Sequence, residues 1–408
     1  MTLNSLKAVA FAVLLGATPI AAQAQFTDSV IRIGVMNDQN GLYADIGGQG
    51  SVAAARLAVE DFGGRIRGVP VEVVFADTQN RADVATTTAR RWYDNERVDI
   101  IVDGAASSTA LAIQEVAREK RRIFANTGSA TSDFTGKFCS PYGFHFTYDT
   151  YALANGTGRA LTQQGGNTWY FITADYAFGH ALERDTASFV QAAGGRMLGA
   201  VRHPLSTSDF SSYLLQAQSS RARVIGLANA GSDFDNALKQ AAEFGLTRGG
   251  VRMAGLLVFI TNIHALGLPV TQGLVATTSY YWDRNDATRA WHRRFAAVRE
   301  GRAATMVQAG TYSAVRHYLR AIEATGTDDA DKVADWMHAN PVNDMNNDNV
   351  RIRPDGRVLH DMLLVQTKTQ AESQGPWDYY RILTTIPGAE AYRPMEQGEC
   401  PTDRRRGS

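Results

Sequence analysis

Residues 31–64 read IRIGVMNDQNGLYADIGGQGSVAAARLAVEDFGG, and the rest of the chain is organised around them. The apolar run Ile31–Met36 predicts a buried strand. After a Gly-rich loop, the helical spacing of apolar residues predicts a helix that ends near Phe62. This is the first strand-loop-helix unit of a parallel α/β sheet. Ligands bind to such sheets beyond the carboxyl ends of the strands, so the loop 41–50 is expected on a binding rim.

The chain repeats this unit three times up to about residue 132. Each repeat begins with an apolar strand, which implies right-handed crossovers and a parallel sheet covered on both faces. The strands are expected at 69–76, 98–102 and 122–125, with a helix at 82–96 after the first of them.

A second set of such units begins near residue 169, so two α/β lobes are expected. Its strands are expected at 169–173, 197–202, 224–228, 253–257 and 274–280, the last of which closes the set. The later helices and strands are too few to bury a core of their own and are expected to dock onto the lobes. They are predicted at 289–299, 309–324, 331–338, 350–352 and 362–365. The chain should therefore cross between the lobes more than once.

The composition excludes several function classes. The 408 residues, 44% hydrophobic and 20% charged, have a globular balance and are too many for one ordinary core. Because 41 Lys and Arg residues balance 41 Asp and Glu residues, there is no whole-chain electrostatic case for nucleic acid or an anionic membrane as a partner. The Arg-rich tail 401–408 is expected to be a solvated end.

The N-terminus has the pattern of a secretory signal peptide. Lys7 precedes a short apolar run, and small residues follow at 22–24. We expect residues 1–24 to be removed on export to the periplasm, because the apolar run is shorter than the roughly 20 residues that span a bilayer. In that oxidising compartment Cys139 and Cys400 are expected to form one disulfide. Two unpaired thiols are the alternative, and sequence separation does not decide between them.

Five segments carry a resemblance to a known family. They are Ile31–Met36 with the Gly-rich rim after it, Ser107-Ser108, Asn126–Thr135, Asp175–Gly179 and Gln240–Leu246. In this order and spacing, and with the signal peptide, residues 30–367 resemble the solute-binding proteins of ABC importers, in particular the leucine/isoleucine/valine-binding family.

The resemblance implies an α/β fold of two doubly wound parallel-sheet lobes joined by a three-segment hinge. The lobes close around a solute by hinge bending, and a membrane permease recognises the closed form. Lobe one is expected at 26–147 with 286–340, lobe two at 148–280 with 347–400, and the crossings near 146–151, 281–285 and 341–346. A monomer is expected.

The resemblance also implies how the ligand is held. Its carboxylate is expected to contact hydroxyls and backbone amides at the exits of strands three and four, where a helix N-terminus offers unpaired N–H groups to an anion. The matching residues are Ser107, Ser108, Thr109, Gly128, Ser129 and Ala130. The alternative for residues 107–109 is that their hydroxyls only cap their own helix.

Three aromatic residues on rim loops are expected to form walls of the cleft. Tyr43 lies on the first rim, and Tyr176 and Phe178 lie on the opposing lobe. For any one of them, core packing is the alternative.

One position departs from the family pattern. Amino-acid binders of the family present an acidic residue after the strand at 253–257, to pair with the ligand's ammonium, whereas this chain has Leu257 there. A buried ammonium without an acidic partner costs several kcal/mol, because the charge loses its hydration and gains no counter-charge. An aromatic or aliphatic carboxylate is therefore favoured over an amino acid, unless Asp233 or Asp175 takes the acidic role.

Enzyme motifs are absent from the sequence, which has no nucleophile elbow, no H-E-x-x-H and no Walker phosphate loop. No catalytic activity, cofactor or metal is expected. The leading hypothesis is a binding module that delivers a small carboxylate to an ABC permease. The alternatives are an amino-acid binder proper, a ligand-sensing subunit of a membrane receptor, and a secreted enzyme on the same scaffold.

Overall fold

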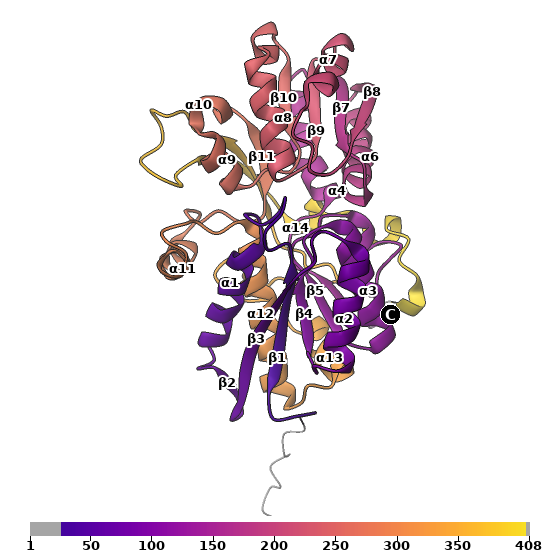
Figure 1. Cartoon of the computed structure of the whole chain (residues 1–408), viewed down its shortest axis with the longest axis vertical. Coiled ribbons are helices and arrows are strands. Elements are labelled where there is room, and N and C mark those ends of the chain that lie inside the picture. Colours follow the sequence, from indigo (N-terminus) through magenta and orange to yellow (C-terminus); the bar gives the residue numbers. More distant parts are fainter. Residues whose placement is uncertain (1–25, 405–408) are drawn as a thin grey trace, which may run out of the picture.

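The computed structural model describes residues 26–404, which form two lobes stacked along the long axis of the molecule (Figure 1). The predicted signal peptide lies outside the described residues. Within residues 26–404, no helix is both long enough and apolar enough to cross a membrane.

The first lobe is built on a six-stranded sheet of order β2-β3-β1-β4-β5-β6. All neighbours pair in parallel except β2 and β3, which form a short antiparallel hairpin. The strands are β1 (Ile31–Asn37), β2 (Arg65–Ile66), β3 (Val69–Asp77), β4 (Ile100–Asp103), β5 (Ile123–Asn126) and β6 (Gly143–His145). The four predicted strands of this lobe form within two residues of their expected positions, and the side chains of β4 and β5 are buried throughout.

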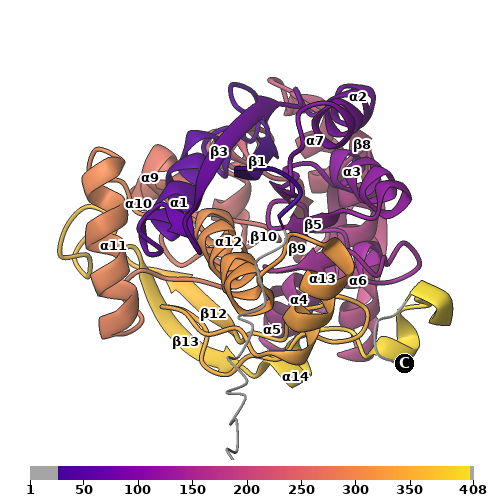
Figure 2. The same ribbon diagram turned by 90° about the horizontal axis from the view of Figure 1, so that it is seen from below.

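Helices cover both faces of this sheet (Figure 2). On one face α1 (Gly48–Glu60) packs against α12 (Met306–Thr325), and on the other α2 (Ala82–Asp94) packs against α3 (Ser107–Lys120). Two more late helices join the first pair, with α13 (Ala330–Ala339) on α12 and α11 (Asp286–Val298) on α1. The late helices therefore complete the first lobe instead of forming a domain of their own.

The second lobe contains a four-stranded parallel sheet of order β10-β9-β7-β8. The strands are β7 (Thr168–Ala174), β8 (Arg196–His203), β9 (Val224–Ala228) and β10 (Arg252–Gly255). The helices are α4 (Thr150–Leu153) and α5 (Arg159–Gln163) with a π-helical turn between them, α6 (Ala177–Ala192), α7 (Ser211–Ser219), α8 (Ser232–Glu243), α9 (Ile260–Leu266) and α10 (Leu268–Thr271).

The expectation that a strand at 274–280 closes this parallel set is wrong. β11 (Val275–Thr278) pairs antiparallel with β12 (Met362–Thr367), which pairs antiparallel with β13 (Tyr380–Ile386) in a separate three-stranded sheet. Between β11 and its partner β12 the chain forms the late helices of the first lobe. Local periodicity therefore carries no signal of this pairing.

The predicted strand at 350–352 is also not formed. Val350 and Ile352 make only isolated bridges, to Val342 and Val358. The chain folds back on itself here, because Gly356, with a φ of +84°, donates its amide to Arg353 and makes a tight turn. The segment is part of a crossing between lobes, not of a sheet.

Three segments connect the lobes, because the chain leaves the first sheet after β6, returns after β11 and leaves again ahead of β12. The buried Arg357 joins the third segment to the first, with Nη1 3.3 Å from Asp149 Oδ2 and Nη2 donating to the Thr147 carbonyl. Asn346 joins the third segment to the second by donating to the Ser279 carbonyl at 2.9 Å. The crossings are thus tied together by polar contacts. The residues at which each lobe begins and ends stay a prediction.

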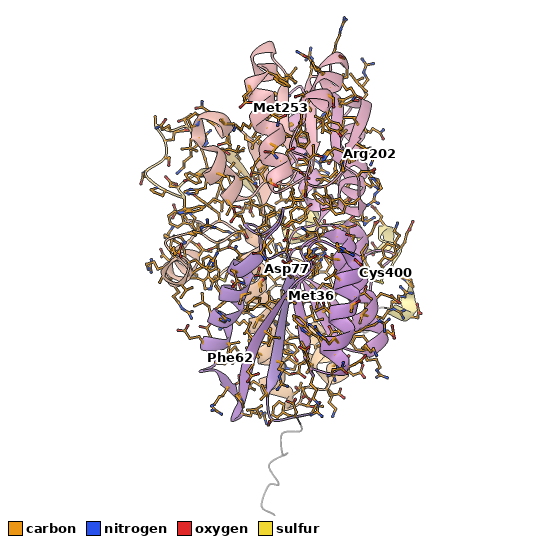
Figure 3. The ribbon with its side chains drawn as sticks, in the orientation of Figure 1. Met36, Phe62, Asp77, Arg202, Met253 and Cys400 are labelled. Carbon is orange, nitrogen blue, oxygen red and sulfur yellow. A yellow bond between two sulfur atoms is a disulfide. The ribbon has the colours of Figure 1, made fainter. Side chains whose placement is uncertain are left out.

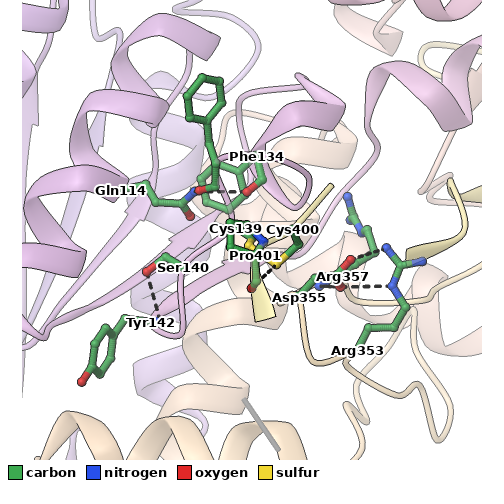
Figure 4. Close-up of a disulfide and its surroundings, with 11 residues drawn as sticks. Gln114, Phe134, Cys139, Ser140, Tyr142, Arg353, Asp355, Arg357, Cys400 and Pro401 are labelled. Carbon is green, nitrogen blue, oxygen red and sulfur yellow. Dashed lines mark hydrogen bonds and ion pairs between the residues drawn. A yellow bond between two sulfur atoms is a disulfide. The ribbon is translucent and has the colours of Figure 1, made fainter. Parts of the chain in front are cut away.

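Cys139 and Cys400 form a disulfide, with their Cα atoms 5.6 Å apart (Figure 4). Cys139 precedes β6 in the first lobe, whereas Cys400 follows β13. The bond lies near the Arg353–Asp355 ion pair and holds the last described residues beside the first lobe. It therefore anchors the C-terminal segment at the lobe opposite to the one that β13 belongs to.

Candidate ligand-binding site

The carboxyl ends of β1, β4 and β5 face the second lobe, and a pocket lies between the lobes. Figure 3 places Met36 and Asp77, at the ends of β1 and β3, near this boundary, and Phe62 at the far end of the first lobe. The pocket is lined by Tyr43, Ile46, Gly47, Asp103, Ala105, Ser107, Gly128, Ala130, Tyr148, Tyr176, Phe178, Ala230, Leu257, Phe259 and Val307.

The start of α3 forms the polar end of the pocket. Ser107 is the first residue of the helix and lines the pocket. Because the first bond of the helix runs from Ala110 N to Ala106 O, at 2.9 Å, the amides of residues 107–109 are left for other partners. These amides and the helix dipole give this end a partial positive charge. Ser107 Oγ accepts from Thr131 N at 3.2 Å, so its own hydrogen is left to donate to a ligand.

Three of the predicted carboxylate contacts do not line the pocket. Thr109 Oγ1 donates to Ala106 O at 2.7 Å, so its hydroxyl serves its own helix turn, as the capping alternative had it. Ser108 is half-buried and outside the lining. Ser129 holds the loop together, because its amide donates to Asn126 Oδ1 and its carbonyl accepts from His145 Nε2. Fewer residues therefore form the polar end of the pocket than the sequence predicted.

Gly128 and Ala130 do line the pocket, and Gly128 has a steric role. Its amide donates to the Asp103 carbonyl at 3.2 Å and is therefore already engaged. A Cβ at this position would lie 2.2 Å from Asp103 Oδ1 and 2.8 Å from Ala105 N. Only glycine fits here, because any side chain would press on a backbone atom that cannot move away.

The three predicted aromatic residues meet in one wall of the pocket. Tyr43 and Tyr176 come from different lobes, and their hydroxyl oxygens lie 2.6 Å apart. Tyr176 is in ring contact with Phe178, with centroids 5.8 Å apart. Burial raises the pKa of Tyr43 well above its ordinary value, and the neighbouring Tyr176 and Asp233 add to the shift. Both hydroxyls are therefore neutral, and the pair forms a hydrogen bond that joins the lobes.

Other contacts between the lobes surround this pair. Gly231, with a φ of +61°, approaches the first rim so closely that a Cβ would lie 2.3 Å from Leu42 O. Elsewhere along the boundary Ser132 Oγ donates to Asp185 Oδ2 at 2.7 Å, and Arg184 pairs with Asp133 at 3.1 Å. The structure is therefore a closed arrangement of the two lobes.

Leu257 lines the pocket together with Phe259, and neither offers charge to a ligand. The ring of Tyr148 packs edge-on against Phe259, with centroids 5.8 Å apart, and its hydroxyl donates to the Gly128 carbonyl at 2.9 Å. The position where amino-acid binders of the family carry an acidic residue is thus part of an apolar wall.

Asp103 is the main residue of the site that the sequence analysis missed. It is the last residue of β4, is completely buried and has a φ of +85°. Its Oδ2 accepts from Asn37 Nδ2 at 2.7 Å, whereas Oδ1 has no hydrogen-bond partner in the described part of the chain. Burial raises the pKa of Asp103 to about 6, against the opposing effect of contacts with Ser51, Asn37 and Ala105. An acidic residue directly before Gly104, where a strand ends, was the available signal.

The two acidic residues considered as substitutes for Leu257 do not line the pocket. Asp175 is exposed and pairs with His180 at 2.8 Å. Asp233 is buried, and its Oδ2 accepts from Ser206 N at 3.2 Å while Oδ1 has no partner among the described residues. Burial raises the pKa of Asp233 to about 6. Asp103 is therefore the acidic side chain that the pocket itself contains.

Among the residues that the structure describes, no Lys, Arg or His lines the pocket. An anion in this pocket is met by helix amides, the Ser107 hydroxyl and the Asp103 carboxyl, and the body of the ligand is met by aliphatic and aromatic carbon. This arrangement suits a small molecule with one polar end.

Comparison with known proteins identifies the family. A family model described as periplasmic binding protein matches residues 30–374. A periplasmic binding protein from Burkholderia mallei is 49% identical, with a TM-score of 0.89 over 91% of this chain and 98% of that one. A branched chain amino acid ABC transporter periplasmic ligand-binding protein from Burkholderia xenovorans is 38% identical, with a TM-score of 0.81 over 91% of this chain and 100% of that one.

The curated relative Leu/Ile/Val-binding protein homolog 6 of Brucella abortus is 25% identical over 319 residues, which are 75% of this chain and 79% of the relative. The two-lobed architecture agrees with the two solved structures. The chain belongs to the periplasmic binding protein family and, within it, to the leucine/isoleucine/valine-binding group of ABC transporter solute-binding proteins.

Proposed function

We propose that this protein binds a small monocarboxylate with an aromatic or aliphatic body in the periplasm and delivers it to a membrane ABC permease. The observation that carries this proposal is the composition of the pocket. One end presents the first amides of α3 and the Ser107 hydroxyl, and the remaining walls are largely apolar. A carboxylate at the helix N-terminus gains about 0.3–2 kcal/mol from the dipole, and the aliphatic and aromatic walls bury the rest of the ligand.

An amino acid is the second candidate, and Asp103 is the observation that favours it. Its unpartnered Oδ1 is an acceptor that a ligand ammonium would satisfy. Leu257 argues against this candidate, because the opposite wall supplies no acidic partner.

The test is a binding screen followed by calorimetry. Benzoate, isovalerate and leucine are titrated into the mature protein, after a thermal-shift screen of aromatic acids, short-chain acids and branched-chain amino acids. We expect at least one monocarboxylate to bind more tightly than leucine. The variant Ser107→Ala with Tyr43→Ala should weaken that binding while circular dichroism shows the fold intact. Unchanged affinity in this variant refutes the assignment of the site.

A transport role is separated from a sensing role by uptake. Deletion of the gene should abolish uptake of the bound acid by cells at low concentration. Intact uptake would favour a sensing subunit on a membrane receptor.

A further inference from the structure

Asp103 places a carboxyl group beside the expected position of the ligand's own carboxylate. It lines the same pocket as Ser107 and Gly128, and its Oδ1 lies so close to Gly128 that a Cβ there would be 2.2 Å away. Oδ2 is engaged by Asn37, whereas Oδ1 has no partner among the described residues. A completely buried carboxylate oxygen without a donor is costly, so this atom requires an explanation.

Among residues 26–404, no cation is positioned to neutralise Asp103. The titratable groups that act on it are Asp38, from the loop after β1, and Tyr148, from the first crossing, and neither is a base. The neutral Ser51 on α1, Asn37 on β1 and the Ala105 backbone amide also contact the carboxyl group, and each of these contacts lowers its pKa. Two carboxylates that share such a site cannot both stay ionised, because each raises the pKa of the other.

An ammonium at Oδ1 would need two further acceptors, because it has three hydrogens to donate. Nearby acceptors are already engaged. The Gly128 carbonyl accepts from Tyr148, the Ala130 carbonyl accepts from Thr150 N at 2.7 Å, and the Tyr43 and Tyr176 hydroxyls are bonded to each other. An ammonium bound to Oδ1 would therefore have to share its other hydrogens with acceptors that already accept one hydrogen bond each. A proton, by contrast, needs only Oδ1 and one ligand oxygen.

We propose that the pocket takes up its ligand together with one proton, which Asp103 Oδ1 holds against the ligand's carboxylate. This inference rests on the proposed function, since it assumes a carboxylate ligand. The ligand enters as the anion, solvent supplies the proton, and the Asp103 carboxyl becomes a hydrogen-bond donor. Asp103 thus acts as a specificity-determining residue that accepts a monocarboxylate without a basic side chain.

The raised pKa of Asp103, about 6, agrees with this role. Below that pH the carboxyl is already protonated, and ligand binding takes up no proton. Above it, each binding event must protonate Asp103, so the dissociation constant should rise with pH by up to about tenfold per pH unit.

The experiment is titration calorimetry with benzoate, or isovalerate if that binds more tightly, in phosphate and in Tris at the same pH. The dependence of the measured enthalpy on the buffer gives the number of protons bound. We expect about one proton per ligand at pH 8 and close to none at pH 5.

The variant Asp103→Asn keeps the size of the side chain, and asparagine tolerates the left-handed backbone at this position. It should bind benzoate without proton uptake and with little change in affinity between pH 6.5 and 8.5. At pH 8 it should bind at least about tenfold more tightly than the natural protein. Asp233→Asn is the matched control, because Asp233 is also buried with an unpartnered Oδ1 and a pKa of about 6 but lies outside the pocket lining. This control should keep the proton uptake of the natural protein.

Two outcomes overturn the inference while the solute-binding role stands. One is benzoate binding without proton uptake at pH 8. The other is loss of all binding in Asp103→Asn while leucine binds the natural protein without a proton, which would make Asp103 an ammonium acceptor. If no monocarboxylate binds at any pH, the proposed function fails together with the inference.

Discussion

Both lobes contribute apolar atoms to the pocket, but the carboxyl group, the serine hydroxyl and the helix N-terminus in its lining all come from the first lobe. The first lobe supplies the polar wall, which we define as Asp103, Ser107 with the start of α3, and Gly128. The second lobe supplies the apolar wall, which consists of Phe178, Ala230, Leu257 and Phe259, with Tyr176 at its edge. For the carboxylate ligand that we propose, this difference predicts that the first lobe recognises the charged end and that the apolar wall of the second lobe helps to cover the body.

The largest effect is expected where the polar wall has no room. Gly128→Ala should weaken benzoate binding at least about 100-fold, equivalent to roughly 2.7 kcal/mol, because the new Cβ would meet Asp103 Oδ1 and the Ala105 backbone. Calorimetry measures the affinity. Gly249→Ala is the control, because nothing lies within 4 Å of a Cβ there, and it should leave the affinity unchanged. If Gly128→Ala binds normally, the ligand does not lie against this wall.

The polar wall should also lower the stability of the folded protein at neutral pH. Burial raises the pKa of Asp103 to about 6 in the folded state, so the folded protein binds more protons than the unfolded chain between about pH 4 and 6. The stability that Asp103 contributes is therefore present below pH 4 and lost as the pH rises through 6. Asp103→Asn should raise the free energy of unfolding by about 2–3 kcal/mol at pH 8 and change it little at pH 4.

Urea unfolding of ligand-free protein at both pH values measures this difference. The same comparison for a residue of the apolar wall, such as Leu257→Met, should show no dependence on pH. If Asp103→Asn is less stable than the natural protein at pH 8, the ionised Asp103 carboxylate does not destabilise the folded state.

The two walls should also differ in what they discriminate. Ser107→Ala should weaken benzoate and acetate by similar factors of about tenfold, because both ligands carry the same carboxylate. Phe178→Ala should weaken benzoate about tenfold and acetate hardly at all, because only benzoate has a body for the apolar wall to cover. Competition titrations measure both ligands. If Phe178→Ala lowers the affinity for benzoate and for acetate by equal factors, the apolar wall does not act on the ligand body alone.

The smallest effect is expected at the hydrogen bond that joins the lobes. Tyr43→Phe removes the hydroxyl that lies 2.6 Å from Tyr176 Oη and keeps the ring in the pocket. A single neutral hydrogen bond contributes about 0.5–1.5 kcal/mol, so the affinity should fall roughly three- to tenfold. Stopped-flow measurements should place the change in the dissociation rate. A change confined to the association rate would contradict a role in holding the lobes closed.

The sequence predicted the polar wall only in part, and the physical reasons differ from residue to residue. Ser107 and Gly128 were predicted because the family resemblance places the ligand's carboxylate at the exits of strands three and four, and the local pattern located those exits. Thr109 and Ser129 were predicted with them, but the Thr109 hydroxyl donates within its own helix turn, and Ser129, whose amide is bonded within its loop, lies outside the pocket lining. Asp103 was missed because the strand was expected to end at residue 102, one position too early.

The sequence also predicted the apolar residues of the pocket only in part. Tyr176, Phe178 and Leu257 were predicted from rim loops and one family position. Tyr148 and Phe259 also line the pocket but were not predicted. They are distant in the chain and meet only in the folded protein, where their ring centroids lie 5.8 Å apart. Such contacts depend on how the lobes close, which no local pattern contains.

The sequence by itself determined the repeating strands and helices, and with them the two lobes and the edge where a ligand binds, because these follow from the spacing of apolar residues along the chain. The tertiary structure decided which groups are partners: β12 for β11, Cys400 for Cys139, and Tyr176 for Tyr43. It also left Asp103 Oδ1 without a donor among the described residues. Whether a polar atom is paired or left bare depends on which distant segment reaches it, and only the folded chain brings those segments together.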